Sequence, residues 1–272
     1  MLVILSGCSG VGKNTIISRL LVDMEKYELL PTYTTREMRE NEEQGKPYYF
    51  ISDEEFKGRL RDGELYESEI VHEHFYGTSR NLLLEKKKSK KILIKDIDVK
   101  GTQNLVKLAK KDIDILTFFL YVKSKDILIE RLKGRGEKNI ELRLSRYDME
   151  MQYANQYSYI IDNEDMEKTI NIIESLIAFE QSNNILLPTE GIRDINMEVV
   201  EKYAQSYRAG EDLSSIFITE KNGKWYIVDG HHRYLASIMA GVRIPKEVIE
   251  SKYFDKVEAY SWEDLVEEIK KI

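Results

Sequence analysis

Short apolar runs, each followed by residues of a different periodicity, mark the start of the chain. Residues 1–7 are mostly apolar and end in Ser-Gly, a glycine-rich segment follows at 8–14, and apolar residues then recur at helical spacing over 15–24. This pattern predicts a strand, a glycine loop and a helix. A further apolar run at 91–98 ends in two acids, which places carboxylates at the C-terminal end of a strand, where α/β proteins bind ligands.

The pattern changes near residue 182, where Ser-Asn-Asn interrupts a helical stretch. The remaining residues predict a short apolar strand from 185, a helix at 196–210, a hairpin of 215–220 and 224–230, a helix at 232–241, a strand at 246–251 and a final amphipathic helix from 261. Asn222-Gly223 forms the hairpin turn. We therefore expect two domains, at 1–180 and 183–272, the first α/β and the second a smaller α+β unit.

Composition narrows the class of protein. With 272 residues, 33% of them charged and 42% hydrophobic, the chain is long enough for one or two globular domains. The net charge of -7 argues against nucleic-acid binding through an overall positive field. Cys8 is the only cysteine, and the longest apolar run, 115–122, is too short to cross a bilayer. We expect a cytoplasmic protein without a membrane segment.

The segment after the first strand has the spacing Gly7-x-x-x-x-Gly12-Lys13. In a P-loop, glycines let backbone amide groups surround a phosphate, and the lysine reaches its outer oxygens. A turn that only joins a strand to a helix has no need of that lysine. The predicted nucleotide-binding residues are Gly7, Ser9, Gly10, Gly12, Lys13, Asn14 and Thr15. Asn14 stands where a Ser or Thr usually binds magnesium, and an amide oxygen can still coordinate that cation.

Several segments together resemble the guanylate kinase family over residues 1–180. They are the P-loop, "TYTTREMR", "GKPYYF", "FYGTS", "ILIKDIDVKG", "ERLKGRG" and "YIIDNED". The resemblance implies a P-loop fold, with helices on both faces of a parallel sheet and a lid. It also implies transfer of a phosphoryl group from ATP to GMP or a related purine nucleotide, with Mg²⁺ as cofactor.

The same resemblance implies roles for individual residues. The acceptor phosphate would contact Thr32, Arg36, Arg39, Tyr48 and Tyr76, and the guanine would contact Glu67 and Thr78. Two arginines and two phenols suit a phosphate dianion, and a carboxylate can accept from the guanine N1–H and exocyclic amine. Asp98 would lie beside the acceptor and serve as a possible magnesium ligand, while Asp96 precedes it on the same strand.

Four arginines would supply the cations of the lid: Arg131, Arg135, Arg143 and Arg146. Phosphoryl transfer requires charge neutralisation as closure expels water. With Lys13, Arg135 and Arg143 are our candidate catalytic cations. Some of the four can instead be solvated residues of a helix face. The segment between them, "GEKNIE", is shorter than the usual lid of the family.

Two histidines, His72 and His74, lie two apart in "IVHEHFYG", and on a strand they would share one face. One interpretation is that the two histidines bind a metal ion, but two ligands make a poor metal site. The simpler interpretation is that they are half-exposed residues of a strand.

The stretch "VDGHHRYLA" resembles the turn of the ParB/sulfiredoxin fold, where a G-x-x-R sequence opens a helix. Gly230 allows close backbone approach, and Arg233 adds a charged fork for an anion. Sulfiredoxin chemistry needs a cysteine at the position of His231, which excludes that branch. From residue 183 onward there are 12 Lys and Arg against 16 Asp and Glu, so DNA binding is disfavoured.

Within that fold, the D-G-H-H-R sequence is similar to free-amino-acid kinases such as ADP-dependent serine kinase. The similarity implies that Glu190 is the catalytic base on a substrate hydroxyl, that Asp229 is catalytic in positioning substrate or metal, and that Gly230, His231, His232 and Arg233 hold phosphate. The donor would be ADP or ATP. The alternative is that the D-G-H-H-R sequence has only a structural role, with an acid that caps a helix followed by surface histidines.

Three hypotheses follow. The first is a bifunctional kinase, with a guanylate kinase-like domain and a domain that phosphorylates a small hydroxyl substrate such as free serine. The second makes the first domain a guanine-nucleotide-binding regulator without catalysis, motivated by Asn14 and the short lid. The third makes the second domain a nucleotide-dependent binding module or clamp in the manner of ParB.

Overall fold

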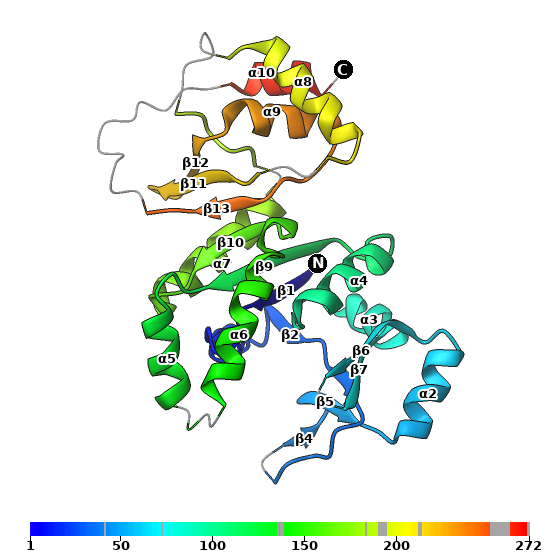
Figure 1. Ribbon diagram of the computed structural model, residues 1–272. Helices are drawn as coiled ribbons and strands as arrows, with labels where there is room; N and C mark the ends of the chain where they lie inside the picture. The colour runs from blue at the N-terminus through cyan, green and yellow to red at the C-terminus, as the bar shows by residue number, and fades with distance from the viewer. Residues whose placement is uncertain are drawn as a thin grey trace. The chain divides into compact units, whose positions relative to one another are not determined.

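The computed structural model describes most of the chain (Figure 1). The described residues are 1–40, 42–71, 73–134, 136, 139–182, 184–189, 195–211, 214–250 and 262–270. By their internal contacts they form two units, Met1–Leu120 with Leu128–Glu150, and Tyr121–Ile127 with Met151–Ile272. Each unit is described by itself below. Within the described ranges, no helix is both long enough and apolar enough to span a membrane.

The first unit contains a parallel sheet with the strand order β9-β1-β8-β2. Its strands are β1 (Leu2–Gly7), β2 (Tyr27–Leu29), β8 (Ile92–Asp96) and β9 (Ile115–Tyr121), and its helices α1 (Lys13–Leu20) and α4 (Val99–Ala109) pack against β1. Every residue of β1 and β9 is buried, as continuous apolar runs predict for central parallel strands. The α/β prediction for this part of the chain is confirmed.

A second sheet of the first unit has the order β4-β5-β3-β7-β6. Its elements are β3 (Thr32–Thr34), β4 (Glu43–Gln44), β5 (Pro47–Phe50), α2 (Asp53–Arg61), β6 (Leu65–Val71), β7 (His74–Ser79), α3 (Arg80–Lys86) and the 3-10 turn η1 (Lys87–Ser89). The lid helices that follow β9 are α5 (Lys125–Gly134) and α6 (Ile140–Met151).

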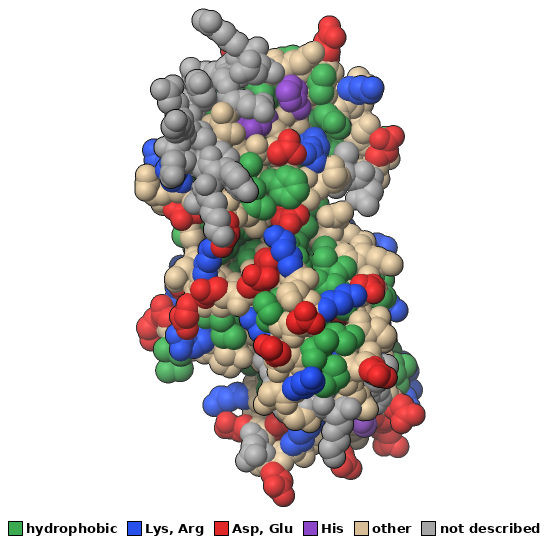
Figure 2. Space-filling model, turned by 60° about the vertical axis from the view of Figure 1, so that its left-hand side comes forward, with side chains coloured by type: hydrophobic (Ala, Val, Ile, Leu, Met, Phe, Trp, Pro, Cys, Tyr) green, Lys and Arg blue, Asp and Glu red, His purple; other side chains and the backbone are tan. Residues whose placement is uncertain are grey.

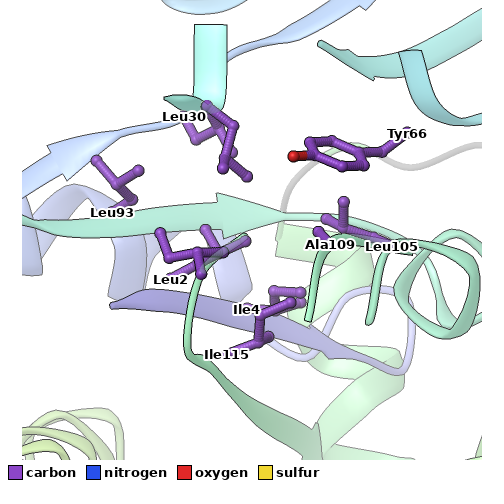
Figure 3. Packing of buried hydrophobic residues seen from close by; sticks show 10 residues of the cluster. Leu2, Ile4, Leu30, Tyr66, Leu93, Leu105, Ala109 and Ile115 are labelled. Atoms are coloured by element: carbon purple, nitrogen blue, oxygen red, sulfur yellow. The ribbon is translucent and has the colours of Figure 1, made fainter. Parts of the chain in front are cut away.

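An apolar cluster joins the two sheets of the first unit (Figure 3). Leu2, Ile4 and Leu93 of the parallel sheet pack in one cluster with Tyr66 of β6. The hydroxyl of Tyr66 donates to Asp112 Oδ2 at 2.6 Å. The pairing of β6 with β7 is irregular between Leu65 and Glu67, so Tyr66 and Glu67 lie at a local break in the regular register, and both are buried. The Tyr66 anchor thereby ties the segment that carries Glu67 to the core.

The second unit has a mixed sheet with the order β12-β11-β13-β10. Its elements are η2 (Ala154–Gln156), β10 (Tyr159–Asp162), α7 (Met166–Gln181), α8 (Met197–Arg208), β11 (Ile216–Lys221), β12 (Lys224–Asp229), α9 (His231–Ala240), β13 (Lys246–Val248) and α10 (Glu263–Ile269). β10 and β13 pair in parallel, with Tyr159 opposite Lys246. The predicted boundary near 182 therefore lies inside this unit, and an independent domain from 183 onward stays a prediction.

Three local expectations are modified. The first helix ends at Leu20 rather than at residue 24. The short strand from residue 185 is reduced to one bridge, between Leu187 and Tyr226. A single strand through "IVHEHFYG", on which both histidines would share one face, does not form, because Glu73, with φ of 67°, turns the chain between the antiparallel strands β6 and β7. His74 begins β7, and His72 lies outside the described residues.

Charge on the surface is mixed. On the face shown in Figure 2, basic and acidic side chains are interspersed over the described residues rather than gathered into a broad basic field. This agrees with the net charge of -7. The absence of DNA binding remains an expectation.

Candidate functional site

The turn between β1 and α1 has the left-handed backbone that its glycine spacing predicts. Gly7, Gly10 and Gly12 have φ of 126°, 85° and 108°, a region that residues with a Cβ rarely adopt. A Cβ at Gly7 would lie 2.0 Å from the carbonyl oxygen of Leu120, so only glycine lets β1 approach β9 this closely. Gly12 is the N-cap of α1 without a side-chain cap, which leaves amide groups for an anion.

Lys13, the first residue of α1, folds back over this turn. Its Nζ donates to the carbonyl oxygens of Gly7 at 2.9 Å and Cys8 at 3.3 Å. The ammonium thus lies beside the loop whose phosphate it is predicted to bind. Asn14 and Thr15 are exposed in the first turn of the helix. The amide of Asn14 is open to solvent, which suits a ligand of a cation that keeps several waters.

Two lid arginines contact the same loop. Arg131 Nη1 of α5 donates to the carbonyl oxygen of Val11 at 3.1 Å, and Arg143 Nη1 of α6 donates to Ser9 Oγ at 3.1 Å. The structure therefore places both cations at the P-loop, and their role as lid cations stays a prediction. Arg135, the other candidate catalytic cation, lies outside the described residues.

An acid of α6 also reaches the P-loop. Glu150 Oε2 accepts from the backbone N–H of Ser9 at 3.0 Å. Burial raises the pKa of Glu150, although the Ser9 N–H, the Lys13 ammonium and Arg146 act in the opposite direction. A carboxylate therefore occupies one of the amide groups that the sequence assigns to phosphate, and a bound phosphate would compete with it for that donor.

Three of the side chains predicted to hold the acceptor phosphate lie together, and their role toward phosphate stays a prediction. The rings of Tyr48 and Tyr76 meet edge to face at 5.9 Å, and the Arg36 guanidinium lies 5.4 Å from the centre of the Tyr48 ring. Arg36 Nη2 donates to Glu42 Oε1 at 2.6 Å. Arg39 is exposed. Burial raises the pKa of Tyr48 to about 12, so this phenol stays a neutral hydrogen-bond donor at neutral pH.

The predicted base-reading pair lies together on neighbouring strands. Glu67 of β6 is opposite Thr78 of β7, and the Thr78 hydroxyl donates to Glu67 Oε1. Glu67 is 6% exposed and Thr78 is fully buried. Burial raises the pKa of Glu67, while Lys95 and the Thr78 hydroxyl lower it. A buried carboxylate with one oxygen fixed by a hydroxyl is suited to reading the N–H groups of a planar base.

Asp96, the last residue of β8, and Asp98, two residues later, lie in different environments. Asp98 is the N-cap of α4, and its Oδ1 accepts from the backbone N–H groups of Lys100 at 2.8 Å and Gly101 at 2.9 Å. Burial raises the pKa of Asp96, and the Lys13 ammonium opposes that shift. Among the residues that the structure describes, no three acidic, histidine or cysteine side chains gather into a metal cluster.

A lysine for which the sequence predicted no role is buried in the first unit. Lys95 of β8 is fully buried, and its Nζ donates to Thr32 Oγ1 at 2.6 Å. Thr32 itself was expected to contact the acceptor phosphate, and its hydroxyl instead accepts from Lys95 in this structure. A role of Thr32 toward phosphate stays a prediction.

The turn at 228–233 in the second unit has a similar entry into its helix. Gly230, with φ of 97°, is the N-cap of α9 and has no side-chain cap. Arg233 Nη2 lies 3.0 Å from Asp229 Oδ2, and Arg233 Nη1 donates to Ser214 Oγ and to the Ser215 carbonyl oxygen, both at 2.7 Å. The side chain of Asp229 is 65% exposed, whereas that of Arg233 is 16% exposed.

The paired histidines of this turn differ in environment. His231 is 2% exposed, its Nε2 accepts from the Thr189 N–H at 3.1 Å, and its ring meets Trp262 edge to face. His232 Nε2 accepts from the Asn196 N–H at 2.9 Å. Both rings thus use Nε2 to hold neighbouring backbone, and phosphate binding by them stays a prediction. Glu190 lies outside the described residues.

Comparison with known proteins assigns the part of the chain that contains the P-loop, but not the 228–233 turn. Residues 1–180 match the family model described as Guanylate kinase. The chain belongs to the guanylate kinase family.

Relatives and a solved structure agree with this assignment. The chain is 41% identical over 178 residues to the guanylate kinase of Helicobacter pylori (strain 26695), which covers 64% of this chain and 85% of that protein. It is 32% identical over 203 residues to the guanylate kinase of Thermotoga maritima, covering 73% and 95%. The crystal structure of guanylate kinase from Anaplasma phagocytophilum matches with a TM-score of 0.52 and 28% identity, covering 66% of this chain and 86% of that one.

Two residues of this guanylate kinase family member were missed by the sequence analysis. Glu150 could have been found, because Arg143, Arg146 and Glu150 are spaced to share one face of α6. Lys95 gave no such signal, since a single lysine in an apolar run is more often read as the solvent-facing residue of a strand. The family match ends at residue 180, so the resemblance of the 228–233 turn to the ParB/sulfiredoxin fold stays a prediction.

Proposed function

We propose that residues 1–180 transfer the γ-phosphoryl group of ATP to GMP. The observation that supports this most directly is the Glu67 and Thr78 pair, which lies in the same unit as the Lys13 loop. One end of the unit is suited to a polyphosphate and the other to a guanine, as a nucleoside monophosphate kinase requires.

At the acceptor end, the ionised Glu67 accepts from the guanine N1–H and 2-amino groups, which adenine does not present there. The phenols of Tyr48 and Tyr76 donate to the acceptor phosphate, and Arg36 neutralises its charge after exchanging its Glu42 partner for phosphate. Fixing base and phosphate together aligns the attacking oxygen with the donor.

At the donor end, the amide groups of the 7–13 turn and the Lys13 ammonium hold the β- and γ-phosphates. Arg131 and Arg143, which already contact the loop, stabilise charge on the transferring oxygens as the lid excludes water. Mg²⁺ supplies further charge neutralisation when bound. The exposed Asn14 amide and the second carboxylate oxygen of Asp98 are the side-chain oxygens that would hold it.

A coupled assay of ADP formation with GMP and ATP tests this function. We expect turnover in the wild type and a loss of about 10²-fold or more in Lys13→Met, because a fixed cation at the transferring phosphate is removed. Lys107→Met is the matched control, since Lys107 is an exposed residue of α4. If GMP raises the melting temperature but no phosphate moves, the domain is a guanine-nucleotide-binding regulator and the proposal is wrong.

For the second unit we propose a further phosphotransferase site at the 228–233 turn, acting on a small hydroxyl substrate such as free serine with ADP or ATP as donor. The observation that favours it is the uncapped N-terminus of α9 beside a guanidinium that Asp229 and Ser214 hold in place. Asp229, held beside the Arg233 guanidinium, would position substrate or metal, while Glu190, which lies outside the described residues, would be the base on the substrate hydroxyl.

This second function is tested with a panel of hydroxyl substrates and each donor. We expect Asp229→Asn to abolish phosphorylation of the hydroxyl substrate and to leave GMP phosphorylation intact, while Lys13→Met has the reverse effect. The absence of turnover with both donors in the wild type would remove the proposal. In that case, DNA binding that weakens steeply with salt would favour a ParB-like clamp.

A further inference from the structure

The P-loop lies directly against both lid helices. A Cβ placed on Gly10 would lie 2.7 Å from the side chain of Leu132 in α5, so α5 packs on the backbone of the loop at that point. The preceding residue, Ser9, is contacted by two side chains of α6, those of Arg143 and Glu150. The loop that is predicted to hold phosphate is therefore also the surface on which the lid helices rest.

Arg143 and Glu150 reach Ser9 from the same face of α6. Their separation along the helix is about two turns, a spacing that places two side chains one above the other. Glu150 Oε2 accepts from the Ser9 N–H at 3.0 Å, and Arg143 Nη1 donates to Ser9 Oγ at 3.1 Å. A single residue of the P-loop thus holds α6 at two points.

The two contacts differ in what they can fix. Arg143 is proposed to neutralise charge on the transferring oxygens, so its guanidinium has to turn toward phosphate during the reaction. A fixed point for α6 has to persist through that movement. The Glu150 contact meets this need, because it is a charge-assisted hydrogen bond to a backbone amide, and a backbone amide does not rotate as the Ser9 hydroxyl does.

Glu150 also withholds the Ser9 N–H from phosphate. To take that donor, a phosphate would have to leave a half-buried carboxylate without its hydrogen bond, next to an anion of the same sign. The start of α1, at Gly12, has no side-chain cap and provides other amide groups for an anion. The arrangement of lower free energy therefore keeps Glu150 on Ser9 and places phosphate further along the turn.

We propose that Glu150 is a positioning residue for phosphoryl transfer, which anchors α6 on the Ser9 N–H while nucleotide is bound and thereby places the Arg143 guanidinium on the transferring phosphate. This inference rests on the proposed function of residues 1–180. A cation that is displaced from the transferring oxygens loses much of its effect on the transition state, whereas binding of the substrates changes less. Loss of the anchor should therefore lower kcat rather than raise KM.

Two substitutions of Glu150 separate the hydrogen bond from the bulk of the side chain. Glu150→Met removes the acceptor for the Ser9 N–H at similar length, whereas Glu150→Gln keeps an oxygen that can accept from it. We expect kcat for GMP phosphorylation to fall about tenfold or more in Glu150→Met, with KM for ATP within about threefold of the wild type, and Glu150→Gln to recover most of that loss. Glu141→Met, the same substitution at an exposed position of α6, is the control and should change neither quantity.

Two outcomes of these assays contradict the inference. An unchanged kcat in Glu150→Met would show that α6 needs no such anchor. Tighter binding of ATP by Glu150→Met than by the wild type would show that the carboxylate competes with phosphate instead of positioning the helix.

A double-mutant cycle shows whether Glu150 acts through Arg143. If it does, Glu150→Met should cost little further kcat once Arg143 has been replaced by Met, so that the two losses are not additive. Additive losses would show a structural role of Glu150 that is independent of Arg143, and would overturn the inference.

A crystal structure of the wild type with Mg²⁺ and a non-hydrolysable ATP analogue tests the anchor even if the variants do not fold. We expect Glu150 Oε2 to remain within hydrogen-bond distance of the Ser9 nitrogen. A phosphate oxygen in that place would overturn the inference. The absence of GMP turnover in the wild type would instead count against the proposed function, and the anchor would still be judged by this crystal structure.

Discussion

Two acidic side chains of the first unit are wholly or partly buried at its predicted binding positions. Glu67 is buried and accepts from the Thr78 hydroxyl, and the charge of Lys95 acts to lower its pKa, while Glu150 accepts from a P-loop amide. For both acids the loss of hydration outweighs these partners, so their pKa values are raised. A raised pKa in the folded state means that ionisation of the group destabilises the fold. The contribution of each of these two acids to the free energy of unfolding is therefore greatest at low pH, where the acid is protonated.

This relation predicts that Glu150→Gln stabilises the protein near neutral pH. The glutamine carbonyl oxygen can still accept from the Ser9 N–H, but no charge has to be buried. The difference in melting temperature from the wild type should shrink as the pH falls through the raised pKa toward that of an unfolded glutamate, about 4.3. Thermal unfolding over a range of pH measures it.

The matched control for that prediction is Glu141→Gln, at an exposed position in the first turn of α6. It should change the melting temperature little at any pH. A lower melting temperature for Glu150→Gln at neutral pH would mean that the charged form of the Ser9 contact outweighs burial.

At the scale of elements, the turns decide how strands and helices are connected. Asn222 and Gly223 have φ of 54° and 76°, the two positive values that a type I′ hairpin turn needs between β11 and β12. No atom lies within 4 Å of a Cβ placed at Gly223. The demand for glycine there comes from the backbone alone and not from packing.

Gly223→Ala should therefore lower the free energy of unfolding of the second unit by about 1 kcal/mol or more. Both tryptophans, Trp225 and Trp262, belong to this unit, so tryptophan fluorescence during denaturation reports on it. Gly58→Ala is the control, because Gly58 lies inside α2 of the first unit with open space around it and no positive φ. An unchanged midpoint for Gly223→Ala would contradict the turn assignment.

Elements whose signals are local could be predicted from the sequence. The P-loop and the 215–230 hairpin each carry glycines at fixed offsets, and both form as expected. The turn at Glu73 was missed because no Gly, Pro or Asn marks it. The burial of Lys95 was missed for another reason: its hydrogen-bond partner Thr32 belongs to β3 of the other sheet, and only the assembled sheets bring it to β8.

At the scale of the whole molecule, the second unit combines residues from both sides of the end of the family match. β10 pairs with β13, the Lys246 N–H donates to the Ser158 carbonyl oxygen at 3.1 Å, and Trp225 Nε1 donates to Ser175 Oγ at 3.1 Å. Residues before 180 thus depend on residues after it for backbone hydrogen bonds and packing.

We accordingly expect a chain that ends at residue 181 to melt at a lower temperature than the full chain and to self-associate, because the edge of β10 that faces β13 is left unpaired. Calorimetry and light scattering measure the two effects. Trp225→Phe in the full chain is the control, since it removes one hydrogen bond and costs about 1 kcal/mol. A shortened chain that melts like the full one and stays monomeric would establish an independent domain boundary near 182.

The pairing of β10 with β13 also has a consequence for how the protein is made. A ribosome delivers β10 well before β13, so one side of β10 stays without its partner strand until residues 246–248 have emerged. Contacts between residues so distant in sequence form slowly. Maturation of the second unit therefore has to wait for the synthesis of β13, and any chaperone that shields nascent strand edges would find its target at residues 159–162.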